Sequence, residues 1–144
     1  MILILGGTTE GRMAVKVADE AGSLYYYATR GSLQQIVCKY GIHVTGGMDL
    51  PYMIEFCRSN SIRLLIDAAH PFAMELHRTV AATSEALQLP VVRVERTYPE
   101  YSADLVWCDD YEDAIKKLKE AGIIRLLALT GVQTIGMLQD YWKE

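Results

Sequence analysis

The sequence has few cysteines, no marked excess of charge and no long apolar segment. Its three cysteines, Cys38, Cys57 and Cys108, are widely spaced and form no C-x-x-C pair. This argues against a disulfide framework or a zinc site and favours a reducing compartment, where we expect buried, unreactive thiols. The 14 basic residues are outnumbered by 18 acidic ones and form no run, so binding along a nucleic-acid backbone is not expected. The most apolar later stretch, residues 62–69, contains two charged residues and is too short to span a bilayer.

We therefore expect a cytoplasmic protein that binds neither nucleic acid nor membrane; the sequence leaves its oligomeric state open. Two nucleotide-binding signatures are also missing. No Gly-Lys dipeptide occurs, which rules out a P-loop. None of the nine tyrosines is followed four residues later by lysine, so the chain does not fit the short-chain dehydrogenases.

Short apolar runs alternate with segments of helical periodicity along the whole chain. Such an alternation, with short connections, is typical of a parallel sheet with helices on both faces. We predict an α/β, Rossmann-like domain over residues 1–100. Its strands are expected at 2–5, 24–29, 42–45, 62–67 and 91–94, and its helices at 10–21, 33–40, 49–59 and 71–87.

The last part of the sequence repeats this plan. Residues 126–131 are an apolar run that ends in Thr-Gly. Residues 2–7 are a similar apolar run that ends in Gly-Gly. We expect strands at 105–108 and 125–130 and helices at 110–121 and 134–142. Residues 101–144 are thus predicted to be the start of a second Rossmann-like domain that is cut short.

The first loop, residues 6–11, carries the strongest single motif. Glycines after a buried strand bring amides close to an anion, and the next helix adds the positive end of its dipole. In the dinucleotide pattern G-x-G-x-x-G, Gly6 and Gly11 match the first and third glycines, while Thr8 stands in place of the second. A phosphate-binding loop and a tight turn without a ligand both fit this segment.

The second strand ends in Thr29-Arg30, where enzymes specific for NAD usually have a carboxylate. A guanidinium suits a 2′-phosphate, which favours NADPH over NADH. The alternative is that Arg30 is simply solvated beside a turn.

The segment Asp67-Ala-Ala-His70-Pro71-Phe72-Ala73 follows the fourth predicted strand. Pro71 is expected to fix the helix start and so to hold His70 at the strand-to-helix corner, where it could donate a proton or bind an anion. A structural histidine with one backbone hydrogen bond is the alternative. His77 lies seven residues further on, but no third ligand is apparent and no metal is expected.

Two arginines, Arg93 and Arg96, lie near the end of the fifth strand. They could bind substrate carboxylates, or they could form a surface network with glutamates. His43 is expected to be structural.

Three segments together resemble a known family. Gly6-Gly7-Thr8-Thr9-Glu10-Gly11-Arg12, Asp67 to Ala73 and Arg93-Val94-Glu95-Arg96 are similar, in this order, to the G-G-T-x-E-x-R, D-A-T-H-P-F-A and R-x-E-R-P motifs of the precorrin-6A reductases of cobalamin biosynthesis. The sequence departs from the family at Ala69, where threonine is usual, and at Thr97, where proline is usual. Family members are also longer and have a second Rossmann-like domain.

The resemblance implies an oxidoreductase. It would transfer hydride from NADPH, or from NADH as the alternative, to a double bond of the tetrapyrrole precorrin-6A or its cobalt form, and a proton would go to the adjacent carbon. His70 is the predicted proton donor, and the alternative function is a nucleotide-binding sensor module without catalysis. The predicted cofactor-binding residues are Gly6, Gly7, Thr8, Thr9, Glu10, Gly11, Arg12, Thr29 and Arg30. The predicted substrate-binding residues are Asp67, His70, Pro71, Phe72, Arg93 and Arg96.

Overall fold

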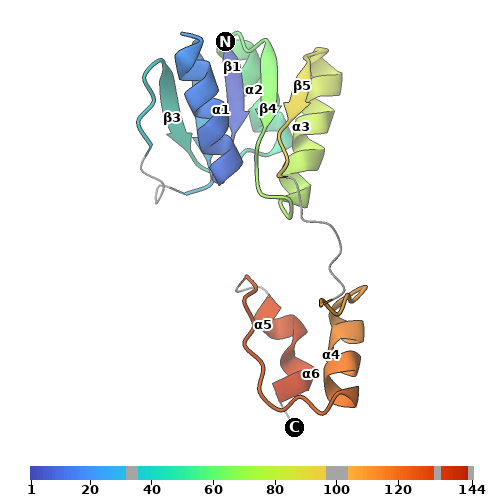
Figure 1. Cartoon of the computed structure of the whole chain (residues 1–144). Helices are drawn as coiled ribbons and strands as arrows, with labels where there is room; N and C mark the ends of the chain where they lie inside the picture. The colour runs from blue at the N-terminus through green and yellow to red at the C-terminus, as the bar shows by residue number, and fades with distance from the viewer. Residues whose placement is uncertain (32–35, 97–103, 132–133, 143–144) are drawn as a thin grey trace. The chain divides into compact units, whose positions relative to one another are not determined.

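Five parallel strands form the sheet at the centre of the first part of the chain. The computed structural model describes residues 1–31, 36–96, 104–131 and 134–142. The sheet has the strand order β3-β2-β1-β4-β5, and all of its strands end at the same edge (Figure 1). The strands are β1 (Ile2–Leu5), β2 (Tyr25–Thr29), β3 (Gly41–Thr45), β4 (Leu64–Asp67) and β5 (Val91–Arg93).

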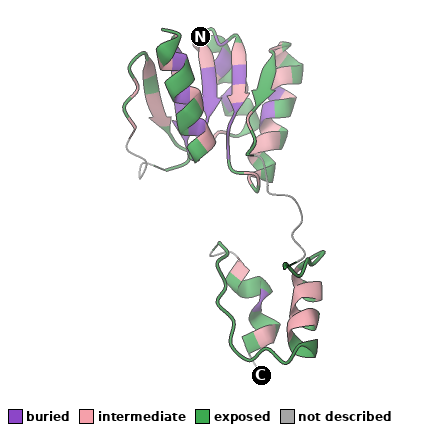
Figure 2. Ribbon diagram, viewed as in Figure 1, coloured by how far each residue is buried: buried purple, intermediate pink, exposed green. Residues whose placement is uncertain are grey.

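Three helices cover this sheet: α1 (Thr9–Glu20) on one face, and α2 (Leu50–Ser59) and α3 (Met74–Leu87) on the other (Figure 1). Side chains alternate between the two faces of a strand. Leu3, Leu5 and Leu65 therefore pack against α2 and α3, while Ile4 and Tyr27 pack against α1. Burial of the central strands is visible in Figure 2. The predicted α/β fold with helices on both faces is confirmed.

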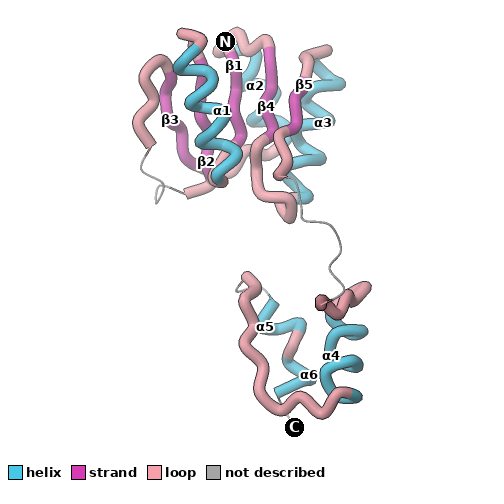
Figure 3. The backbone as a smooth tube through the Cα atoms, viewed as in Figure 1, coloured by secondary structure: helices cyan, strands magenta, loops and turns pink. Residues whose placement is uncertain are grey.

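Strand order reverses between β1 and β4. After β3 the chain returns across the sheet, so that β4 lies beside β1 rather than beside β3. The loops that leave β1 and β4 then run to opposite faces of the sheet (Figure 3). In open parallel sheets, ligands bind at this reversal, beyond the carboxyl ends of the strands.

Two of the helices predicted for this part of the chain differ from the structure by more than one residue. Of the helix expected at 33–40, residues 33–35 lie outside the described residues, and residues 36–40 are not helical. There the Asp19 carboxylate accepts the amides of Lys39 and Tyr40, at 3.2 and 3.0 Å, in place of helical carbonyls. Helix α3 begins at Met74 rather than at residue 71, because a turn over Pro71-Phe72 comes first.

The chain divides into two units, Met1–Thr97 and Tyr98–Glu144. The second unit contains α4 (Tyr111–Glu120), α5 (Thr134–Met137) and α6 (Gln139–Trp142), so the helix expected at 134–142 is two short helices. Neither expected strand, 105–108 or 125–130, is a strand in the structure. A strand needs a hydrogen-bonded neighbour, and no strand pairing lies within the described residues of this unit. That this unit begins a second Rossmann-like domain stays a prediction.

Candidate functional site at the sheet reversal

The loop between β1 and α1 is filled on its inner side and open on its outer side. Tyr27 lies beneath it, so close that a Cβ atom at Gly6 would come within 2.2 Å of the ring. The Tyr27 hydroxyl accepts the amide of Gly7 at 3.0 Å. Gly7 itself has φ +101°, and a Cβ atom there would meet nothing within 4 Å. The segment therefore needs glycine at both positions: Gly6 for space, Gly7 for its backbone conformation.

Thr8 joins this loop to the loop after β4. Its side chain is buried at the start of α1, where Oγ1 accepts the amide of Gly11 at 3.0 Å. The same hydroxyl donates to the carbonyl of Ala68 at 2.7 Å. The two motif segments, 60 residues apart, thus meet at the point where strand order reverses.

Glu10 and Arg96 connect the same loop to the segment after β5. An Arg96 Nη2 atom donates to Glu10 Oε2 at 3.1 Å. The Glu10 amide and then the Arg96 guanidinium lower the pKa of the Glu10 carboxyl below its ordinary value. The first turn of α1 therefore already holds one negative charge. Beside it, the exposed Arg12 donates to the Thr9 hydroxyl at 3.1 Å.

At the corner after β4, the two predicted site residues Asp67 and His70 lie in different surroundings. Asp67 is 3% exposed, and its carboxylate accepts the amide of Ala69 at 3.3 Å. His70 is exposed and lies edge-on to the ring of Phe72, which is 85% exposed. The Phe72 amide donates to His70 Nδ1 at 3.2 Å, which leaves Nε2 to carry the proton in the neutral ring.

The predicted arginines both have carboxylate partners within the chain. Arg93 donates to Asp67 Oδ2 at 3.3 Å and to Glu95 Oε1 at 2.5 Å, and Arg96 is paired with Glu10. The arginine–carboxylate network is thus present in the described structure, and the binding of substrate carboxylates by Arg93 and Arg96 stays a prediction.

His77 is a member of the same cluster that the sequence analysis did not place in the site. Its Nδ1 atom lies 2.7 Å from Asp67 Oδ2, and its Nε2 atom lies 3.0 Å from the His70 carbonyl oxygen and 3.3 Å from Arg93 Nη2. A histidine in the first turn of the helix after a buried strand-end aspartate is the signal that could have pointed to it.

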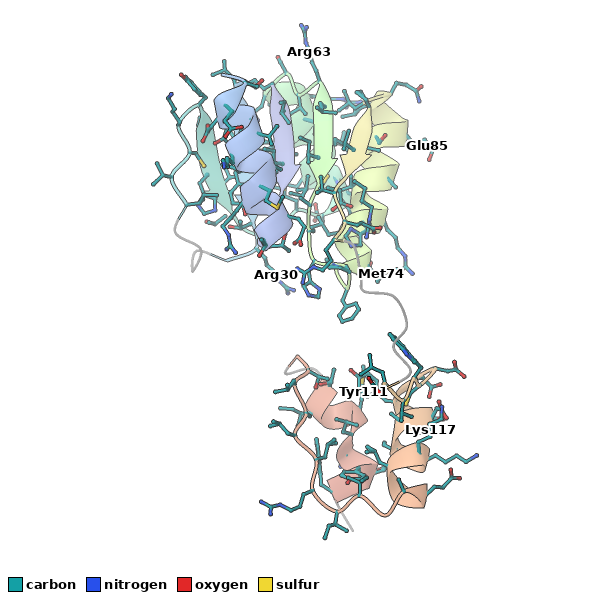
Figure 4. All side chains as sticks on the ribbon, in the orientation of Figure 1. Arg30, Arg63, Met74, Glu85, Tyr111 and Lys117 are labelled. Carbon is teal, nitrogen blue, oxygen red and sulfur yellow. The ribbon has the colours of Figure 1, made fainter. Side chains whose placement is uncertain are left out.

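At the end of β2, Thr29 is buried and Arg30 is exposed. The Thr29 hydroxyl donates to the Gly31 carbonyl at 2.8 Å, and its oxygen lies 2.7 Å from His43 Nε2. Arg30 projects from the carboxyl edge of the sheet, and Arg63 lies at the opposite edge (Figure 4).

The remaining expectations concern metals, membranes and thiols. Within the described ranges, no three His, Cys, Asp or Glu side chains are grouped to hold a metal ion. None of the helices described is both long enough and apolar enough to cross a bilayer. Cys57 is buried, but Cys38 is half-buried and Cys108 is exposed, so the expectation of three buried thiols is wrong for Cys108. It flanks α4 rather than lying within an apolar strand.

Comparison with known proteins gives one consistent result. A family model described as precorrin-6x reductase CbiJ/CobK matches residues 1–144. Over 149 residues the sequence is 30% identical to a precorrin-6A reductase of Rhodococcus erythropolis, with 98% of this chain and 59% of the relative aligned. Over 147 residues it is 28% identical to a cobalt-precorrin-6A reductase of Priestia megaterium, with 97% of this chain and 56% of the relative aligned.

A solved structure titled CobK precorrin-6A reductase has the same fold. It aligns with a TM-score of 0.64 and 23% identity, covering 71% of this chain and 41% of its own. The chain thus spans somewhat more than half the length of the two curated relatives described above.

Proposed function

Since this chain belongs to the precorrin-6x reductase CbiJ/CobK family, as its motifs predict, we propose that it acts in the reduction of precorrin-6A or its cobalt form. The observation that carries the proposal is the Thr8–Ala68 hydrogen bond. It brings the glycine loop and the histidine corner together at the strand reversal, where a cofactor and a substrate can meet.

The loop residues fit a dinucleotide. Gly7 has open space on its outer side. The amides of Gly7 and Gly11 already donate to Tyr27 and Thr8, so the positive end of the α1 dipole and Arg12 would do most of the work of holding a phosphate. Arg12 is exposed and donates to the Thr9 hydroxyl in the first turn of α1. Glu10 is the exception in the predicted set, because its carboxylate would repel a phosphate; we assign it the role of holding Arg96.

The cofactor is a reduced nicotinamide, which when bound supplies hydride to one carbon of the double bond. The proton for the adjacent carbon would come from His70, whose outer nitrogen carries it in the neutral ring. The exposed Arg30 and the absence of a carboxylate at the end of β2 favour NADPH. The exposed Phe72 and the adjacent Pro71 offer apolar surface to the tetrapyrrole.

Titration of the purified chain with NADPH and with NADH tests the cofactor half of this proposal. A charge-assisted hydrogen bond to phosphate is worth about 1.5–3 kcal/mol, so Arg30→Ala should weaken NADPH binding by about 10–100-fold and leave NADH binding unchanged. Arg63→Ala is the matched control, because it removes an exposed arginine at the opposite edge of the sheet (Figure 4). If neither NADPH nor NADH bound, the cofactor half of the proposal would be contradicted.

An assay of precorrin-6A reduction, monitored through the oxidation of NADPH, tests the substrate half of the proposal. Binding of a nicotinamide together with no affinity for a precorrin-6A analogue would overturn the reductase assignment and favour a sensor module. In the active protein, His70→Ala should slow turnover and change its pH profile. An unchanged profile would rule out His70 as the proton donor.

A further inference from the structure

His77 contacts three parts of the candidate site at once. From the first turn of α3 it reaches the Asp67 carboxylate at the end of β4, the His70 carbonyl at the corner and the Arg93 guanidinium at the end of β5. Its side chain is 10% exposed, and that of Asp67 is 4% exposed. These contacts place it at the junction of three of the predicted substrate-binding residues.

The chemistry of the three partners fixes where the ring protons must be. Asp67 Oδ2, at 2.7 Å, only accepts, so Nδ1 carries a hydrogen. The other nitrogen, Nε2, faces a carbonyl oxygen that only accepts and an Arg93 nitrogen that only donates. Nε2 cannot serve both partners at once, because it has either a lone pair or a hydrogen.

We infer that His77 is a positioning residue whose protonation state selects the partner of its outer nitrogen. In the neutral ring, Nε2 accepts from Arg93 and keeps that guanidinium against Asp67. In the protonated ring, Nε2 donates to the His70 carbonyl, fixes the corner and places a second positive charge beside Arg93. When His77 takes up a proton, the hydrogen-bond partner of its Nε2 atom thus changes from Arg93 to the His70 carbonyl.

Among the residues that the structure describes, two charged side chains contact the ring. Asp67 faces it from β4 and Arg93 from β5, with Glu95 on the far side of Arg93. The charged groups nearby on α3 and on the adjacent α2 have partners of their own: Glu75 with Arg78, Asp49 with the Tyr52 amide, and Glu55 with Ser59.

The tautomers of the two neighbouring histidines give a direct test. When both imidazole rings are neutral, His77 should carry its hydrogen on Nδ1, because Asp67 accepts it. His70 should carry its hydrogen on Nε2, because its Nδ1 accepts the Phe72 amide. Imidazole ¹⁵N spectra of the labelled chain distinguish the two forms. On acidification, the His77 Nε2 signal should move from the range of a lone-pair nitrogen to that of a protonated one.

A second measurement uses the Ala73 amide, which donates to the same His70 carbonyl at 2.8 Å. The Ala73 amide proton should therefore shift when His77 gains its second ring proton. His77→Asn keeps a donor near Asp67 but removes the outer nitrogen, so this shift should disappear. The Phe72 amide is bonded to His70 Nδ1 rather than to the His70 carbonyl, so its signal serves as the internal control.

A neutral His77 that carries its hydrogen on Nε2, or an Ala73 shift that persists in His77→Asn, would overturn the inference. Its importance for catalysis rests on the proposed function, since His70 is the proton donor only there. The spectra need neither cofactor nor substrate. A failure of the switch is therefore distinguishable from a failure of the reductase proposal.

Discussion

A single methyl group added at Gly6 should disrupt the floor of the glycine loop. In Gly6→Ala the new Cβ would lie 2.2 Å from Cε2 of Tyr27 and 2.6 Å from its Cζ and hydroxyl oxygen. The ring cannot move aside easily, because Tyr27 is fully buried and its hydroxyl accepts the Gly7 amide. Either the loop lifts off the sheet or the packing under α1 changes.

Overpacking of this kind costs about 1–3 kcal/mol. Loss of the Tyr27–Gly7 hydrogen bond adds about 0.5–1.5 kcal/mol. We therefore expect Gly6→Ala to lower the free energy of unfolding of the first unit by about 1.5–4.5 kcal/mol. NADPH binding should weaken as well, since the same loop carries the proposed phosphate site.

Urea unfolding followed through backbone amide signals of the first unit measures this loss. Tryptophan fluorescence would not serve, since Trp107 and Trp142 both belong to the second unit. Gly47→Ala is the matched control: it adds the same methyl group after β3, where nothing lies within 4 Å. That variant should stay within about 0.5 kcal/mol of the unmodified chain.

A double-mutant cycle with Tyr27→Leu locates the cause. Once the ring is gone, Gly6→Ala should cost much less than it does alone. The steric reasoning is refuted if Gly6→Ala is as mild as Gly47→Ala, or if its cost is the same in both backgrounds.

Two further predictions concern ionisation. The Glu10 carboxyl has a lowered pKa in the folded chain, so its contribution to stability is complete above the ordinary value of 4.5 and is lost as the pH falls from there through the folded value. Glu10→Gln should therefore flatten the acid side of the urea-midpoint profile, and an unchanged slope would contradict the role of the Arg96 pair. Burial raises the pKa of Cys57 to about 11, so brief iodoacetamide treatment at neutral pH should label the exposed Cys108 and spare Cys57. Peptide mass spectrometry reads the result, and equal labelling of the two thiols would count against it.

The strands of the first unit could be predicted because their signal is local. Leu3 and Leu65 lie in apolar runs bounded by turn residues, and both are completely buried. The signals for the starts of α1 and α2 are equally local, since the side chains of Thr8 and Asp49 cap these helices. The position proposed for the candidate site follows from the fold class, because parallel strands bring their carboxyl ends to one edge.

The wrong predictions of secondary structure concern segments whose conformation depends on residues far away in the sequence. Residues 36–40 are not helical, because the Asp19 carboxylate accepts two of their amides from the end of α1. The apolar segment at 125–130 forms no strand, because apolar character alone supplies no ladder of hydrogen bonds, and Leu127 and Leu129 remain exposed.

By itself the sequence determined the alternation of elements, the sheet edge that carries the motifs and the family to which the chain belongs. Only the tertiary structure decided which charges and hydroxyls meet there: Thr8 with Ala68, Glu10 with Arg96, and His77 with Asp67. The physical reason is that periodicity reports the burial of a local face, whereas a hydrogen bond between segments depends on strand order and on the exact turn that follows each strand.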